Sequence, residues 1–249
     1  MIGIESIFLL SSSKSAVIMN SSEALHGAIY DALKKKLDTD ELHNYQNKSI
    51  FSISPLFSSL GRISTKFRKG ATYLFRLCTL REDIFQVFRD HCMIKGSITI
   101  QGTDFHIVQM ESAAIKLDSL TSSQEFTLNF ISPVTFRSSK PGDIPVPYPE
   151  ILEKYFKSIS ELYIKENSNL YPLLTFLKGR TQPIRFKKYL LIGFRGKIKL
   201  KFPQPTVIPF LSHFLGTGHN CARGMGNTIV EELDVLPPLQ KLRKMMEDG

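Results

Sequence analysis

The stretch GTGHNCARGMGN, residues 216 to 227, combines four glycines with polar and cationic side chains that could hold an anion. Glycine has no side chain, so a phosphate group can approach the main-chain N–H groups of such a stretch closely. Neighbouring cationic groups would favour the anion. We therefore predict a phosphate-binding loop, with contacts from Gly216, Gly218, His219, Asn220, Arg223, Gly224 and Gly226.

Two familiar nucleotide-binding motifs do not fit this stretch. The dinucleotide fingerprint GxGxxG needs a helix after it, but position 221 is Cys and the following residues are typical of a strand. A Walker-type loop needs a Lys followed by Ser or Thr, which the stretch lacks. A purely structural alternative is a helix C-cap at Gly216, a turn, and entry into a strand at Gly226. That alternative explains one pair of glycines better than the whole pattern.

The segment that leads into this stretch and includes it carries charged side chains of positive sign only. Between residues 167 and 230 there are ten Lys and Arg residues and no Asp or Glu. An ordinary solvated face mixes both signs. The segment therefore predicts a surface for a polyanion, although some side chains must point away from any one groove. The expected contacts are Arg185, Lys187, Lys188, Arg195, Lys197 and Lys199.

Histidine side chains offer a second kind of chemistry, because imidazole exchanges protons near neutral pH. His26 and Tyr30 lie four residues apart in a segment with helical periodicity, so their side chains share one face. His26 has a structural interpretation too, as a residue that fills the seam between helix and sheet. His213 lies within the apolar segment PFLSHFL, where packing accounts for it.

The cysteines do not indicate a metal site or a disulfide framework. Cys78, Cys92 and Cys221 form no CxxC pair. The set His213, His219 and Cys221 matches no recognised zinc spacing and lacks a clear fourth ligand. We therefore predict no metal and no cofactor, and the scattered cysteines favour a reducing, cytoplasmic location.

The elements that would position these groups follow from periodicity and composition. The first half predicts a strand at 2–10, a helix at 20–37 capped by Ser21 or Ser22, a helical turn at 38–46, strands at 49–57 and 71–80, a helix at 81–94 and a hairpin at 96–115. After a polar break at 117–124, the second half predicts a strand at 125–133, a helix at 148–165, strands at 183–193 and 194–202 around Gly193, a helix at 205–216 and a strand at 227–236.

This repeated β-α-β-β-α-β order predicts an α+β fold of two tandem ferredoxin-like domains with antiparallel sheets, at 1–120 and 125–249. With 249 residues and 42% hydrophobic content, the chain can bury one large core or two small ones.

The net charge of +9 and the pI near 9.4 favour nucleic acid or another anionic partner. Glu5 interrupts an apolar N-terminal run too short to span a bilayer, so no membrane partner is expected.

Four segments carry a resemblance to a known family. They are EALHGAIYDAL near the N-terminus, FTLNFISPVTFRSSKPGDIPVPYPEIL, IGFRGKIKLKF and the terminal glycine pattern. Together, and in this order along the chain, they resemble the CRISPR repeat-processing endoribonucleases, the Cas six family. The resemblance implies two RRM-like domains side by side. It also implies the substrate, which is the repeat sequence of a precursor CRISPR RNA.

The resemblance further implies cleavage without metal. The ribose 2′-hydroxyl attacks the scissile phosphate and leaves a 2′,3′-cyclic phosphate and a 5′-hydroxyl, which requires a base, an acid and positive charge. Family members with a Tyr, His, Lys triad carry the Tyr in the first helix, the His in the segment after it and the Lys a few residues on. On this chain these positions are Tyr30, His43 and Lys48, and His26 is the rival histidine.

The expected partners follow from this activity. They are the precursor and product CRISPR RNA and the subunits of a CRISPR interference complex, bound by a monomer or a homodimer. Two alternatives stay open. One is a non-catalytic subunit that binds repeat RNA without cutting it, and the other is a ferredoxin-like module that recognises an acidic protein or a small phosphate ligand.

Overall fold

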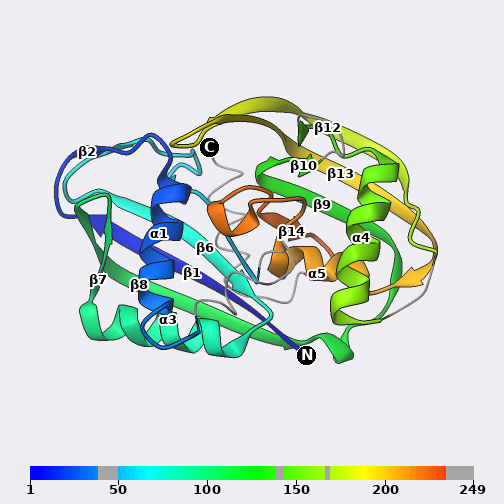
Figure 1. The fold of residues 1–249 in the computed structure, drawn as a ribbon, viewed down its shortest axis with the longest axis horizontal. Coiled ribbons are helices and arrows are strands. Elements are labelled where there is room, and N and C mark those ends of the chain that lie inside the picture. The colour runs from blue at the N-terminus through cyan, green and yellow to red at the C-terminus, as the bar shows by residue number, and fades with distance from the viewer. Residues whose placement is uncertain (39–49, 138–142, 166–168, 234–249) are drawn as a thin grey trace.

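The computed structural model describes residues 1–38, 50–137, 143–165 and 169–233 of the chain. The fold is mixed α/β, and its two larger sheets are antiparallel and lie side by side (Figure 1). Helices α1 and α3 cross the N-terminal sheet, and α4 crosses the C-terminal sheet. Within the described part of the chain, no helix is both long and apolar enough to cross a membrane.

The N-terminal sheet has the strand order β3-β6-β1-β8-β7, with β4 paired to β6. Its strands are β1 (Ile2–Ser12), β3 (Phe51–Ile53), β4 (Phe57–Ser58), β6 (Thr72–Thr79), β7 (Ser97–Ile100) and β8 (Thr103–Lys116). The helices are α1 (Ser21–Leu33) and α3 (Glu82–Lys95), and a small sheet joins β2 (Ala16–Val17) to β5 (Lys66–Phe67). The predicted hairpin at 96–115 is confirmed as β7 and β8.

The C-terminal sheet has the order β12-β13-β9-β14. Its strands are β9 (Ser123–Val134), β12 (Leu173–Arg185), β13 (Leu190–Thr206) and β14 (Thr228–Val230). The helices are α4 (Pro149–Tyr163) and α5 (Ile208–Leu215), with short 3-10 turns η1 (Leu117–Ser119) and η2 (Cys221–Arg223). Strand β10 (Phe136–Arg137) pairs with β11 (Asp143–Ile144). In the N-terminal sheet, β1 lies beside β6, the strand that precedes α3. In the C-terminal sheet, β9 lies in the same way beside β13, the strand that precedes α5.

Helix α1 begins at an asparagine cap. The side chain of Asn20 accepts a hydrogen bond from the backbone N–H of Glu23 at 3.0 Å, which is the usual N-cap contact. The expected caps, Ser21 and Ser22, are instead buried in the first turn. Ser21 accepts a hydrogen bond from the N–H of Leu56, so its hydroxyl joins the helix to the segment between β3 and β4.

The prediction of two strands that meet at Gly193 is wrong. A single long hairpin joins β12 to β13, its turn lies at residues 186–189, and Gly193 pairs with Gln182 inside it. A Cβ at Gly193 would lie 2.8 Å from Pro133 Cβ and 2.9 Å from the Val134 carbonyl oxygen. The glycine therefore permits close approach to β9 and does not mark a turn.

Helix α5 fills the space between the two sheets. Its Phe214 ring lies against Gly3 of β1, and the helix also contacts β3, β6 and β14. The opposite face of the N-terminal sheet is covered by α1 and α3, whose Ile29 and Phe88 join its core. Strand β1 is therefore buried on both faces, and its polar residues Glu5 and Ser6 are buried along with its apolar ones.

Candidate nucleic-acid interface

The stretch 216–227, called the glycine loop below, connects α5 to β14 and packs tightly on the protein itself. Its four glycines have φ values of 75°, 82°, 86° and 56°, in the left-handed region that favours glycine. A Cβ at Gly224 would lie 2.0 Å from Ser22 Cβ, and a Cβ at Gly226 would lie 1.8 Å from the Thr217 carbonyl oxygen. Backbone conformation and close packing therefore both require these glycines.

The glycine loop does not offer the open N–H groups that the sequence suggested. Gly216, Gly224 and Gly226 are buried. The N–H of Gly224 donates to the Cys221 carbonyl, and that of Gly226 donates to the Pro133 carbonyl at 2.8 Å. These bonds engage the two N–H groups within the protein, so phosphate contact by Gly224 and Gly226 has no support from the structure and stays a prediction, while Gly216 caps α5 as the structural alternative proposed. The half-buried members of the loop that remain candidates for RNA contact are Gly218, His219, Asn220 and Arg223.

The His219 imidazole has a lowered pKa, so its neutral form is favoured near pH 7. Burial lowers its pKa, and although Asp143 opposes this effect, Arg137 adds to it. The Nε2 atom lies 3.5 Å from Asp143 Oδ1. A contact from His219 to RNA near pH 7 would therefore be a hydrogen bond rather than a cation–phosphate pair.

The glycine loop lies against the helix that carries the candidate catalytic residues. Its turn η2 contacts both α1 and β3, Ala222 packs on the N-terminal core, and Gly224 packs on Ser22. On α1, the rings of His26 and Tyr30 have centroids 5.9 Å apart, and both residues are half-buried. The predicted pairing of His26 with Tyr30 on one helix face is confirmed.

His26 also stacks on Phe51 of β3, with ring centroids 6.1 Å apart and an interplanar angle of 25°. Phe51 comes soon after the segment that carries the other two candidates, His43 and Lys48. Those two residues lie outside the described residues, so their triad with Tyr30 stays a prediction.

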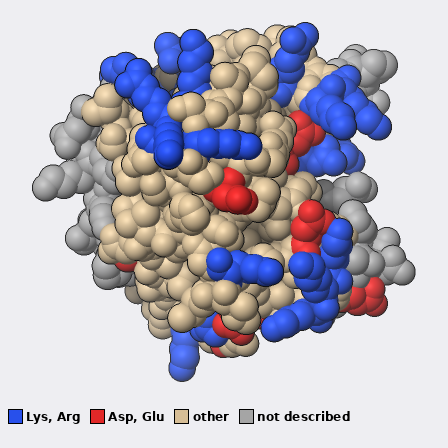
Figure 2. Space-filling model, turned by 90° about the vertical axis from the view of Figure 1, so that its left-hand side faces the viewer, with Lys and Arg blue, Asp and Glu red and all other residues tan. Residues whose placement is uncertain are grey.

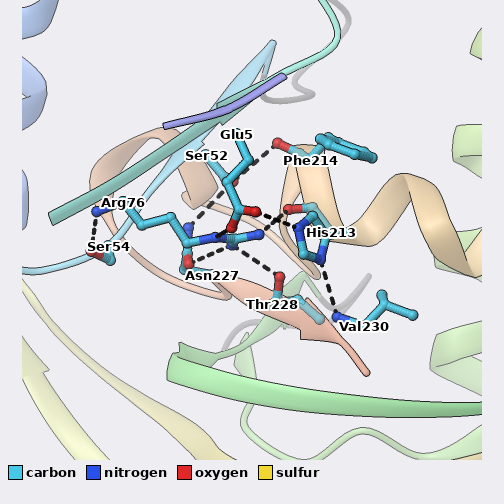
Figure 3. Close-up of polar contacts among 9 residues, drawn as sticks. All are labelled: Glu5, Ser52, Ser54, Arg76, His213, Phe214, Asn227, Thr228 and Val230. Atoms are coloured by element: carbon cyan, nitrogen blue, oxygen red, sulfur yellow. Dashed lines mark hydrogen bonds and ion pairs between the residues drawn. The ribbon is translucent and has the colours of Figure 1, made fainter. Parts of the chain in front are cut away.

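A buried polar network holds the end of the glycine loop to the N-terminal sheet (Figure 3). Arg76 of β6, whose side chain is fully buried, forms an ion pair with Glu5 of β1. Its guanidinium also donates to Asn227 Oδ1 at 2.8 Å, to the Thr228 carbonyl at 3.0 Å and to the His213 carbonyl at 3.1 Å. One side chain of the N-terminal half therefore binds α5 and the start of β14.

His213 is part of this network, which corrects its interpretation as a packing residue. The N–H of Val230 donates to His213 Nδ1 at 3.2 Å, and Nε2 lies 3.5 Å from the Glu5 carboxylate. Burial raises the pKa of Glu5, but Arg76 and His213 outweigh it and hold that pKa at about 2. Glu5 is therefore a carboxylate at neutral pH.

Glu5, Cys78 and His213 bring possible metal-ligand atoms together inside this network. Burial raises the pKa of Cys78 well above its usual value, so the thiol stays protonated. The Arg76 guanidinium already neutralises Glu5. A cation would therefore compete with a fixed positive charge and gain no thiolate, which disfavours a metal here.

The basic residues of β13 share one face of the C-terminal sheet. Ile198, Leu200 and Phe202 are buried towards the helices, where Phe202 meets Phe156 of α4 at 5.5 Å between ring centroids. Residues 195, 197 and 199 alternate with these and lie on the opposite face. The structure thus brings three predicted RNA contacts together: Arg195, Lys197 and Lys199. Lys197 also pairs with Glu231 at 2.5 Å.

A hollow of about 850 Å³ adjoins this face, and we call it the arginine hollow. Its basic lining residues are Arg62, Lys178, Arg180 and Arg195, with Gly179 and Gly196 between them. Arg180 lies directly opposite Arg195 in the hairpin, and like charges opposed in this way destabilise a sheet. Burial lowers the pKa of Arg195, and Arg180 lowers it further. No acidic residue lines the hollow within the described chain, so an anion would relieve the repulsion.

The remaining basic candidates lie at the tip of the hairpin, where they meet α1. The Asn20 amide donates to the Arg185 carbonyl at 3.1 Å, and the N–H of Lys187 donates to Glu23 Oε2 at 2.9 Å. Lys187 and Lys188 form the exposed turn. Lys and Arg side chains are prominent over the upper part of the face shown in Figure 2, where few acidic side chains accompany them. The predicted basic tract therefore divides into a sheet group and a tip group.

Comparisons with known proteins find solved structures that have the same fold. No protein-family model matches the chain, and no curated protein matches it by sequence. Among solved structures, a Cas6 product complex superposes with a TM-score of 0.76 at 18% identity, covering 92% of this chain and 99% of that one. A Cas6-related protein from Pyrococcus furiosus gives 0.72 at 14% identity, covering 92% and 98%. An RAMP protein binding different RNA substrates gives 0.71 at 14% identity, covering 92% and 99%.

These similarities establish that the chain has the fold of Cas6 proteins over nearly its whole length. The family resemblance inferred from four short segments is confirmed at the level of the fold. The sequence identities of 14–18% mean that these similarities show the fold and assign no role to any residue of this chain.

Proposed function

We propose that this protein belongs to the Cas6 family and that it binds precursor CRISPR RNA and cuts it within the repeats. One observation carries the proposal. The glycine loop of the C-terminal half packs on α1, the helix that carries the half-buried His26 and Tyr30, and its Arg223 bonds Tyr189 at the basic tip of the β12–β13 hairpin. The Cas6-like fold supports the same conclusion.

We further propose that the two halves are ferredoxin-like domains. In each half the elements follow the order strand, helix, two strands, helix, strand, and the sheet places the second strand next to the third, then the first, then the fourth. That order supports two related units divided near residues 120 to 125. Strand β7 is an addition to the edge of the first unit.

The proposed reaction is transesterification of RNA. The 2′-oxygen loses its proton to a base and bonds to phosphorus, while the bond from phosphorus to the 5′-oxygen breaks and that oxygen takes a proton from an acid. We assign proton transfer to His43 and stabilisation of the negative charge on the phosphate to Lys48. Tyr30 is the third member of this triad and lies on α1. His26, one turn from Tyr30, is the alternative histidine.

The test is incubation with repeat RNA in EDTA. We expect cleavage that persists in the chelator, stops when the scissile 2′-hydroxyl is replaced by hydrogen, and falls at least a hundredfold in His43→Ala, a loss of the size that removal of an acid–base group causes. His106→Ala is the matched control, because His106 is exposed on β8. Cleavage that requires a divalent metal, or that survives the 2′-deoxy substitution, would contradict the proposal.

A second function is a repeat-RNA-binding subunit that does not cut. It is favoured by the similarity to an RAMP protein binding different RNA substrates. This alternative predicts tight binding of repeat RNA with no scission in any variant. The same RNA in a binding assay and in a cleavage assay separates the two functions.

A further inference from the structure

A hollow of about 730 Å³ lies where the tip of the β12–β13 hairpin meets the start of α1, and we call it the tip hollow. Two hydrogen bonds between side chains at the start of α1 and the main chain of the hairpin tip fix the two walls of the hollow relative to each other: the Asn20 amide donates to the Arg185 carbonyl, and the Lys187 N–H donates to the Glu23 carboxylate. The hollow is thus a built feature of the contact between the two halves. The proposed cleavage chemistry makes no use of it.

An aromatic pair forms one wall of the tip hollow. The rings of Phe186 and Tyr189 are stacked, with centroids 5.0 Å apart and an interplanar angle of 22°. Phe186 is only 2% exposed, whereas Tyr189 is 41% exposed. Phe186 therefore supports one face of the tyrosine ring, and the exposed side of the ring borders the hollow.

The orientation of Tyr189 is fixed at both ends. The backbone N–H of Phe186 donates to the Tyr189 carbonyl at 2.8 Å, which closes the hairpin turn. At the other end of the residue, Arg223 Nη1 donates to the tyrosine hydroxyl at 3.1 Å. Arg223 belongs to the glycine loop, so the ring is tied to the loop that lies against α1. A ring held in this way loses little conformational entropy when a ligand stacks on it.

The charge around the tip hollow favours a ligand that is both aromatic and anionic. Its basic lining residues are Arg185, Lys187 and Lys188, against a single acid, Glu23, within the described chain. The Glu23 carboxylate already accepts the N–H of Lys187. A nucleotide has the required combination, since its base has an aromatic face and its phosphates are anionic.

We propose that Tyr189 is a stacking platform for one unpaired nucleobase of the bound RNA, with the neighbouring phosphates near Arg185, Lys187 and Lys188. This inference rests on the proposed function, because it assigns a subsite for the same RNA. It places one recognised nucleotide at the hairpin tip, apart from the arginine hollow.

The experiment measures the affinity of repeat RNA for three variants. Tyr189→Ala should weaken binding about tenfold, within the range found when an aromatic platform is removed. Tyr189→Phe keeps the ring and should stay within about threefold of the parent protein. Tyr171→Ala is the matched control, because Tyr171 is also 41% exposed and its hydroxyl also bonds a side chain, that of Glu150 at 3.1 Å. We expect no change in the control.

A set of repeat RNAs, each with one abasic nucleotide, then identifies the base. One abasic position should weaken binding to the parent protein and cause no further loss in Tyr189→Ala, since the two changes remove the same stacking interaction. Equal additional losses at every abasic position would give Tyr189 a structural role and overturn the inference. If the parent protein cuts the RNA and Tyr189→Ala binds it with the parent's affinity, the stacking role of Tyr189 is contradicted and the proposed function stands. If the parent protein neither binds nor cuts the RNA, both the stacking role and the proposed function are contradicted.

Discussion

Arg76 donates a hydrogen bond to the side-chain oxygen of Asn227 at 2.8 Å, and through it a strand of the N-terminal sheet holds the last residue of the glycine loop. The amide of Asn227 donates in turn to Ser52 of β3 at 3.3 Å, and Ser52 donates to the Phe214 carbonyl at 3.0 Å. Arg76 and Asn227 are both buried. The position of the glycine loop relative to α1 therefore depends on a charged side chain in the protein interior.

Replacement of Arg76 should be among the most destabilising changes in this protein. Arg76→Met leaves the Glu5 carboxylate without its ion pair and should cost about 3–5 kcal/mol of unfolding free energy in urea. Arg76→Lys restores the charge but not the planar fork that reaches Asn227, so it should recover less than half of that loss. Full recovery by lysine would show that the hydrogen bonds to the C-terminal half contribute little.

Stability should fall in acid because of Glu5. Its pKa is held at about 2 in the folded protein, below its usual value of 4.5. The folded state therefore favours the ionised form, so this stabilisation is fully present above about pH 5 and is lost as the pH falls towards 2. The loss should be on the order of 3 kcal/mol. Glu5→Gln should flatten this part of the profile of unfolding free energy against pH, and an unchanged slope would contradict the assignment.

The glycine loop should not tolerate a side chain where it meets α1. Gly224→Ala combines a positive φ with a Cβ placed 2.0 Å from Ser22 Cβ, and should cost on the order of 2 kcal/mol. Ser22→Gly should relieve part of this cost in the double variant. Gly27→Ala is the control, because nothing lies within 4 Å of its added Cβ and it lies inside α1. Thermal unfolding should show stabilisation of about 0.5–1 kcal/mol for that control.

The arginine hollow should contribute to RNA affinity at the expense of stability. Arg180→Gln combined with Arg195→Gln should lower the log-log dependence of RNA binding on salt by roughly 0.7 for each phosphate that these arginines neutralise in the parent protein. The same double variant should be at least as stable as the parent, since it removes a repulsive cross-strand pair. Lys157→Gln is the control, because Lys157 pairs with Glu153 on α4. An unchanged salt dependence together with lower stability would mean that the two arginines are structural.

The sequence predicts the helices well because their signals are local. Asn20, Pro149 and Gly96 mark helix ends by conformations that these residue types favour, and apolar spacing indicates the buried faces. Gly193 misled the prediction, because a glycine that permits close strand approach looks the same in sequence as a glycine in a turn. The true turn is marked only by the Lys187–Lys188 pair.

The polar interior could not be predicted from local patterns. Arg76 lies in the apolar segment ATYLFRLCTL and Glu5 in GIESIFLL, and each alone suggests an exposed position. The combination of opposite charges in two strands that are otherwise apolar was the available signal for a buried pair. The roles of the glycines were missed for a similar reason, since their partners Ser22 and Pro133 are distant in sequence.

The placement of α5 between the sheets has a consequence for how the protein unfolds. A fragment that ends near residue 120 would expose the apolar side of β1 and leave Arg76 without its acceptors on α5 and β14. Such a fragment has no covering for one side of its sheet, so the two topologically similar halves should melt in a single cooperative transition rather than independently.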